Sequence, residues 1–190
     1  MKFLLLAGIA SLAISHAAQA AIITVSPATS GGSQINITGE LERGDEIQFT
    51  EVAQNATQGI VNFNSPGGNT ISAIAIGRLI RTYGFNTIVG NDATCTSACA
   101  LAWLAGNVRY VTPDSRVGFH ATYVKDNDGT PNITGGGNAM VGGYLQELGL
   151  SPSAIVALNS PGPNDIYWLQ PADAAKLGIA APALPESRDR

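Results

Sequence analysis

The chain has 190 residues, with 10 lysines and arginines against 14 aspartates and glutamates, which gives a formal net charge of −4. Charged residues make up only 13% of the sequence and form no basic run, which argues against a nucleic-acid partner. Hydrophobic residues reach 45% and glycines number 22. This composition is typical of a folded α/β domain and not of a disordered chain.

The first twenty residues have the pattern of a secretory leader. Lys2 precedes an apolar stretch over residues 3–14 that is too short to span a bilayer, and Ala18-Gln19-Ala20 has the small-x-small form of a cleavage site. We therefore expect a signal peptide over residues 1–20, cleavage near Ala20 and a periplasmic or secreted mature protein. An uncleaved anchor is the alternative. No later segment predicts a membrane span.

The rest of the chain alternates between strand and helix patterns. Residues 21–33 are expected to form a flexible N-terminal arm with one short strand, residues 126–137 a polar glycine-rich loop, and residues 182–190 a tail. Periodicity predicts strands at residues 34–38, 59–64, 86–89, 108–111 and 116–120, and helices at 45–53, 70–83, 97–105, 138–148, 151–158 and 171–177. Such alternation predicts βαβ units with a mainly parallel sheet, in one domain over residues 34–181.

Three segments that could carry chemistry follow predicted strands. Ser97 lies just before an apolar helix, His120 ends a later strand, and Asn64-Ser65-Pro66-Gly67-Gly68 follows an earlier one. A serine hydroxyl needs a base to become a good nucleophile, and His120 is the one histidine beyond the leader. Because ligands collect at the carboxyl ends of strands in open α/β sheets, we expect these segments to meet and to form a hydrolase site.

Each of these residues also has a simpler interpretation. Ser97 could be an ordinary helix N-cap, because serine is favoured at that position. His120 could be a structural residue at the end of a strand, and Gly67-Gly68 could be a plain turn. Only their order along the chain favours the catalytic interpretation.

The two cysteines flank the candidate nucleophile in Cys95-Thr96-Ser97-Ala98-Cys99. Residues four apart on a helical turn have Cα atoms about 6 Å apart, within reach of a disulfide, and an exported chain can keep one. We therefore expect a Cys95–Cys99 disulfide that locks the turn presenting Ser97. Two free buried thiols are the alternative, and with them a cysteine enzyme that uses His120.

Taken in order, these segments resemble the proteolytic subunit of the Clp protease, within the wider ClpP/crotonase-like superfamily. The resemblance runs from about residue 34 to residue 179. It rests on Ile37-Thr38-Gly39-Glu40-Leu41, on Asn64-Ser65-Pro66-Gly67-Gly68, on Ser97 with a helix that ends at Gly106, on Pro113-Asp114-Ser115-Arg116-Val117-Gly118-Phe119-His120, and on Asp173-Ala174-Ala175-Lys176-Leu177-Gly178.

The resemblance implies a ClpP/crotonase-like spiral of βαβ units and a serine-type peptidase. It implies a triad of Ser97, His120 and Asp165, with an oxyanion hole formed by the N–H groups of Gly68 and Ala98. It further implies a peptide or protein substrate, no cofactor, no metal, and a homo-oligomeric ring of three, six or seven subunits.

This chain also departs from that family. Residues 129–137 are glycine-rich where the family has a long interface helix, which weakens the expectation of a double ring. An exported protein would act without the ATP-driven unfoldase, so we expect activity that is independent of ATP. A non-catalytic ClpP-like binding or assembly module is the second hypothesis. An acyl-CoA enzyme is disfavoured, because no basic cluster could hold the phosphates.

Overall fold

The structure, a computed structural model, describes residues 20–28 and 31–184. The predicted leader, apart from Ala20, lies outside the described residues, and so does most of the predicted tail.

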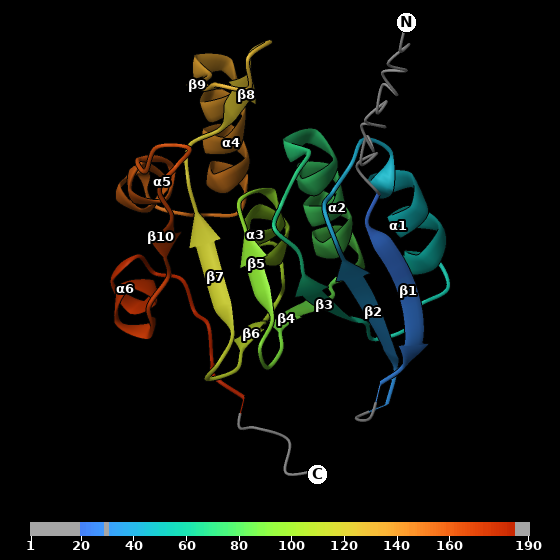
Figure 1. The fold of residues 1–190 in the computed structure, drawn as a ribbon. Helices are drawn as coiled ribbons and strands as arrows, with labels where there is room; N and C mark the ends of the chain where they lie inside the picture. Colours follow the sequence, from blue (N-terminus) through green and yellow to red (C-terminus); the bar gives the residue numbers. More distant parts are fainter. Residues whose placement is uncertain (1–19, 29–30, 185–190) are drawn as a thin grey trace, which may run out of the picture.

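Two sheets form the centre of the molecule (Figure 1). The larger sheet has the order β1-β2-β3-β4-β6, in which β1 is antiparallel to β2 and the other neighbours are parallel. Its strands are β1 (Ile22–Pro27), β2 (Ser33–Thr38), β3 (Ile60–Asn64), β4 (Asn86–Val89) and β6 (Arg109–Val111).

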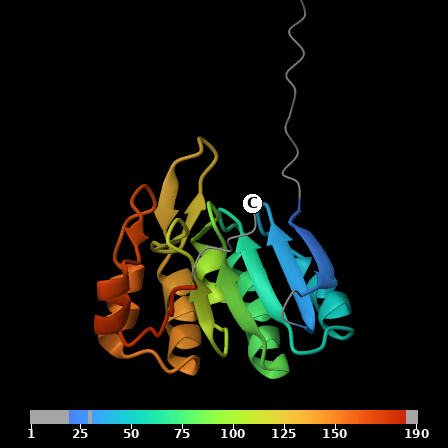
Figure 2. The same ribbon diagram turned by 90° about the horizontal axis from the view of Figure 1, so that it is seen from below.

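The smaller sheet has the order β10-β7-β5, and a bridge between Ser65 and Cys95 joins it to the larger one. It comprises β5 (Thr94–Thr96), β7 (Arg116–Phe119) and β10 (Tyr167–Trp168), while β8 (Tyr123–Lys125) and β9 (Pro131–Ile133) form a separate hairpin. Figure 2 shows the strands side by side across the molecule, with the last helices at the end opposite β1.

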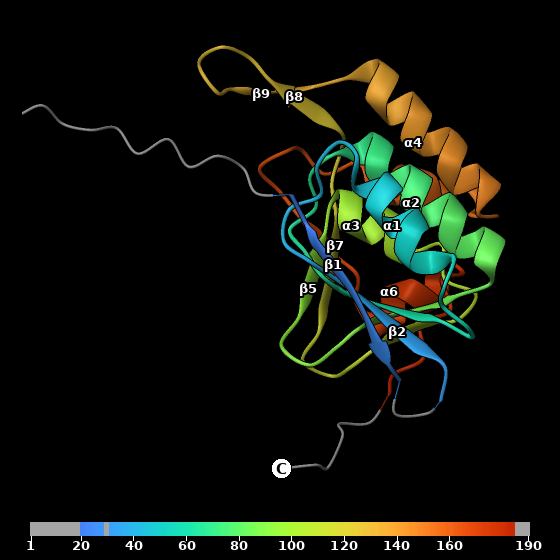
Figure 3. The ribbon, with the colours of Figure 1, turned by 90° about the vertical axis from the view of Figure 1, so that its right-hand side faces the viewer.

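In residues 20–28 and 31–184, six helices pack around the strands. They are α1 (Asp45–Ala53), α2 (Thr70–Tyr83), α3 (Ala98–Trp103), α4 (Gly135–Glu147), α5 (Pro152–Asn159) and α6 (Pro171–Lys176). Figure 3 shows α1, α2 and α4 on the same side of the strands, with the β8–β9 hairpin projecting from the body. Within the described residues, no helix has the length and apolar character that a bilayer crossing requires.

Helix α2 illustrates how local sequence builds this fold. Asn69 caps its start by accepting a hydrogen bond from the Ser72 N–H, and Gly84 ends it with a φ of 66°. Its buried face, including Ile76 and Ile80, packs on α1 and on α3. These contacts hold α2 in place, and the helix begins at Thr70, shortly after the glycine turn at Gly67-Gly68.

Four parts of the fold differ from the sequence expectations. Residues 22–27, expected to hold one short strand within a flexible arm, form the six-residue strand β1, because their β-branched residues pair with β2 along its whole length. The glycines at 135–137, expected in a loop, begin α4, because Thr134 caps it through the Gly137 N–H. The predicted strands on either side of Pro113 lie in different sheets. The short strands β5, β8, β9 and β10 were not expected.

Candidate active site

Ser97 occupies a strained turn between β5 and α3. Its φ of 56° and ψ of −126° lie in a region that non-glycine residues rarely adopt, at a typical cost of about 1–3 kcal/mol. The Ser97 N–H donates to the Gly118 carbonyl at 2.9 Å, which ties the turn to β7. The hydroxyl makes no capping hydrogen bond to α3, so the N-cap interpretation does not describe this serine.

The predicted disulfide is confirmed. Cys95 in β5 and Cys99 in α3 are bonded, with Cα atoms 5.3 Å apart and both residues fully buried. The bond therefore joins the strand before Ser97 to the helix after it. Because both sulfurs are in the disulfide, neither can act as the thiol nucleophile of a cysteine enzyme.

The glycine turn packs directly against the nucleophile. The buried Ser65 hydroxyl accepts from the Gly67 N–H at 3.1 Å, and Thr96 Oγ1 donates to the Pro66 carbonyl at 2.9 Å. Gly67 has a φ of 103°, and a Cβ there would lie only 2.7 Å from the Ser97 Cβ and 3.0 Å from the Ala98 nitrogen. Only glycine fits this close approach.

Two backbone donors beside Ser97 have no partner. The N–H groups of Gly68 and Ala98 donate to no other residue of the described ranges, and both residues line the same cavity as Ser97. Gly68 has a φ of 123°, and a Cβ there would collide with the Leu41 carbonyl oxygen. Ala98 is the first residue of α3, where the helix dipole favours negative charge. The pair can therefore receive an anion.

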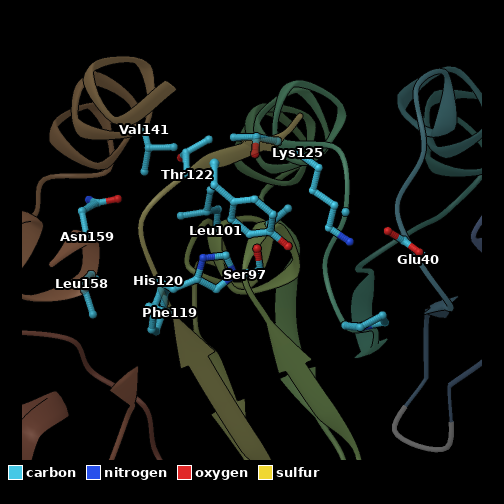
Figure 4. A pocket seen from close by; sticks show the side chains of 15 residues that line it. Glu40, Ser97, Leu101, Phe119, His120, Thr122, Lys125, Val141, Leu158 and Asn159 are labelled. Atoms are coloured by element: carbon cyan, nitrogen blue, oxygen red, sulfur yellow. The ribbon is translucent and has the colours of Figure 1, made fainter. Parts of the chain in front are cut away.

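His120, at the end of β7, lines that cavity with Ser97, and Figure 4 shows their side chains close together. Its Nδ1 lies 2.8 Å from the Ala121 carbonyl oxygen. A carbonyl only accepts hydrogen bonds, so this contact places the proton on Nδ1 and leaves the Nε2 lone pair free. Among the described residues, no hydrogen bond links the Ser97 hydroxyl to the ring. Such bonds often form only when substrate is bound.

The cavity itself has a volume of about 530 Å³ and changes character along its length. Its apolar part is lined by Leu101, Phe119, Val141 and Leu158. Figure 4 shows Val141 and Leu158 on one side of Ser97 and Glu40 on the other, with Lys125 between Ser97 and Glu40. One end is therefore suited to an apolar side chain and the other to polar or charged groups.

The pairing of Tyr167 in β10 with Phe119 in β7 brings the segment that carries Asp165 beside the strand end that carries His120. Asp165 is exposed in a turn where its N–H donates to the Gly162 carbonyl at 3.0 Å, and it is not among the residues that line the cavity. No hydrogen bond between its carboxylate and His120 occurs within the described ranges. The Ala121 carbonyl, which only the tertiary structure reveals, holds the position of an orienting group. Asp173 pairs instead with Lys176 on the surface of α6, at 3.4 Å.

Sequence reasoning missed several residues of the cavity wall. Thr122, Tyr123 and Lys125 follow His120 directly, and their place after a predicted strand end was the available signal. Glu40 lies in a segment that carried the resemblance but had no predicted role, and Asn159 lies far from Ser97 in sequence with no local pattern to mark it.

Comparison with known proteins shows which solved structures share this fold. No family model and no curated protein matches the sequence. Among solved structures, two variants of the 1510-N membrane-bound stomatin-specific protease are similar at 18% identity. The serine-to-alanine variant has a TM-score of 0.61 and covers 81% of this chain and 78% of its own. The lysine-to-alanine variant, in complex with a substrate peptide, has a TM-score of 0.62 and covers 81% and 74%. The chain thus has a ClpP-like α/β fold in a single domain.

Proposed function

We propose that this protein is an exported serine peptidase that cleaves peptides or unfolded proteins without ATP. One observation carries the proposal: a strained serine, two unpartnered backbone N–H groups and an imidazole with a free Nε2 line the same cavity. That combination matches the parts that acyl transfer requires, namely a nucleophile, a base and an oxyanion site.

In the proposed reaction, the Ser97 oxygen attacks the scissile carbonyl carbon while His120 Nε2 takes the hydroxyl proton. The N–H groups of Gly68 and Ala98 receive the oxyanion that forms, and each such donor typically contributes about 3 kcal/mol to the transition state. His120 then protonates the leaving amine, and water releases the acyl group by the reverse sequence. The Ala121 carbonyl keeps the ring in the tautomer that this requires.

The shape of the cavity suggests how a peptide would lie. An apolar side chain would enter between Leu101, Val141 and Leu158, while the chain beyond the scissile bond would pass Lys125 and Glu40. We therefore propose an extended substrate with an apolar residue at the cleaved position. A closed ring of subunits is a separate proposal, which measurement of the mass in solution would test.

A specific observation favours Lys125 as a second candidate base. It lines the same cavity as Ser97, and in one similar structure a lysine-to-alanine variant holds a substrate peptide. Replacing His120 by Gln and Lys125 by Met in separate variants distinguishes the two. If His120 is the base, H120Q loses about 10⁴-fold in kcat, while K125M changes mainly KM. The opposite ranking would assign the base to Lys125.

The decisive experiment uses a fluorophosphonate probe, which forms a covalent bond with an activated serine. We expect the wild-type protein to be labelled at Ser97, with S97A unlabelled and S26A, at an exposed serine of β1, labelled like the wild type. Peptide cleavage should need no ATP. A folded wild-type protein that resists the probe and cleaves no peptide would contradict the proposal and favour a binding module. The observation behind that second hypothesis is that, within residues 20–28 and 31–184, no hydrogen bond joins the Asp165 carboxylate to His120.

A further inference from the structure

Asp45, the first residue of α1, carries a buried carboxylate with no cationic partner in the described ranges. It is only 4% exposed, and its Oδ2 accepts hydrogen bonds from the Glu42 N–H at 2.8 Å and from the Ala21 N–H at 3.3 Å. Arg43 is nearby in sequence but exposed, and no lysine or arginine of residues 20–28 and 31–184 pairs with this carboxylate. Two amides and a helix start stabilise it in part, but buried charges normally have a counter-charge.

Ala21 is the first residue after the expected leader, which ends at Ala20. Ala20 is exposed, whereas Ala21 is 4% exposed and packs beside Gly39, where a Cβ would lie 3.8 Å from the Ala21 Cα. The six-residue pairing of β1 with β2 starts at the next residue, Ile22, and fixes the position of the Ala21 nitrogen. The leader motif therefore predicts cleavage of the Ala20–Ala21 peptide bond. The nitrogen of that bond belongs to Ala21 and contacts Asp45.

We propose that Asp45 is a receptor for the mature N-terminus. Hydrolysis of the Ala20–Ala21 peptide bond by a leader peptidase consumes one water molecule. The new carboxylate stays on Ala20, and the Ala21 nitrogen becomes an amine that takes up a proton. The resulting α-ammonium lies where the amide lay and supplies the positive counter-charge that the Asp45 carboxylate lacks. Processing therefore converts a hydrogen bond into a buried ion pair.

The same segment connects this pair to the proposed oxyanion site. Between Asp45 and the glycine turn lies Leu41, whose N–H donates to the Gly67 carbonyl at 2.6 Å and whose carbonyl accepts from the Asn69 N–H at 2.6 Å. These two bonds hold Gly68 on both sides. A stronger interaction at Asp45 therefore restricts the movement of the turn that carries the Gly68 N–H. This second half of the inference rests on the proposed function, whereas the ion pair itself does not.

The test compares the export-processed protein with a form that keeps one extra residue, Ala20, so that its amine is displaced from Asp45. Both forms are made as wild type, as D45N and as E51Q, the last being a matched control at an exposed carboxylate on the same helix. Mass spectrometry identifies the first residue, and thermal unfolding and the rate of Ser97 labelling are measured for all six proteins.

We expect the processed chain to begin at Ala21 and to unfold about 4 °C above the extended chain, in the range that one buried pair produces in a domain of this size. The difference should vanish in D45N and persist in E51Q, and labelling should be several-fold slower in the extended wild type. A different first residue, equal midpoints, or the same difference in D45N would overturn the proposal. If Ser97 is unlabelled in every form, the proposed function fails, and the midpoints still decide the ion pair.

A second measurement covers the case in which D45N does not fold. The α-amine of the processed wild-type chain is acetylated under native conditions and, separately, after unfolding in urea. If the α-ammonium is paired with Asp45, its acetylation should be at least tenfold slower in the native protein than in the unfolded one. Equal rates would show that the amine is free and would overturn the proposal.

Discussion

The two walls of the cavity are built in different ways. The nucleophile wall is formed by the Ser65–Gly68 turn, β5 and the start of α3. Most of its residues are buried, though Pro66 and Gly68 are exposed, and it is held by a disulfide and by hydrogen bonds between hydroxyl groups and the backbone. The base wall, formed by His120 and the residues up to Lys125, leads into an exposed hairpin on which Val124 is 58% exposed. Its orienting bond to His120 comes from the adjacent residue, Ala121.

This difference separates two tasks. A wall with strained backbone and no room for a Cβ holds its groups in one geometry before substrate arrives, as electrostatic stabilisation of a transition state requires. A wall with few buried contacts opens locally at lower free energy, and such segments commonly adjust to a ligand. We therefore expect substitutions in the nucleophile wall to lower kcat and substitutions in the base wall beyond His120 to raise KM.

Among substitutions outside the proposed nucleophile and base, the largest effect is expected for Gly67→Ala. Its Cβ would press on Ser97 and on the Ala98 nitrogen, so the oxyanion donors would shift and kcat would fall about 10²-fold or more. The matched control is Gly129→Ala in the hairpin, where φ is also positive, at 86°, but no atom lies within 4 Å of the added Cβ. Its kcat should stay within twofold. Equal losses in the two variants would show that backbone strain alone matters and would remove the contrast between the walls.

The next largest effect is expected for the double variant Cys95→Ala/Cys99→Ala. Without the link across Ser97 its strained backbone relaxes more readily, so kcat should fall about tenfold while KM changes little. Closure of so short a loop contributes about 2 kcal/mol by chain entropy, so the urea midpoint should fall as well. Activity is measured far below that midpoint. A stability loss with unchanged kcat would mean that the disulfide serves the fold only.

A smaller effect is expected for Tyr123→Ala in the base wall. Its ring lies 5.5 Å from the His120 ring and lines the cavity, and aromatic pairs of this kind contribute about 0.5–1.5 kcal/mol. We expect KM for a peptide to rise three- to tenfold with a smaller change in kcat. Val124→Ser, at the next position of β8, is the control and should change neither constant. A fall in kcat alone for Tyr123→Ala would assign the tyrosine to positioning the base.

The smallest effect is expected for Asp165→Asn. This carboxylate is exposed and does not line the cavity, so kcat should change less than twofold. Loss of the acid from a working triad lowers kcat about 10⁴-fold. A loss of that size would establish the Ser-His-Asp triad expected from the sequence, with a rearrangement that brings Asp165 to His120 when substrate binds.

Much of the fold follows from local sequence. The bounds of α1 and α2 match the predicted ranges, because side chains three and four residues apart share a helix face whatever the rest of the chain does. The disulfide was accessible for the same reason, since four residues set the distance between its Cα atoms. His120 and the glycine turn could be located because each follows a strand that the sequence itself marks, and Ser97 could be located because an apolar helix begins after it.

Only the tertiary structure decided the rest. Strands β5 and β10 are three and two residues long and gain their hydrogen bonds from β7, a partner far along the chain, so no periodicity predicts them. The same holds for Lys125 in the cavity beside Ser97 and for the contact between Ala21 and Asp45. Sequence specifies which groups are present and their local geometry, but proximity between distant groups depends on how the whole chain packs.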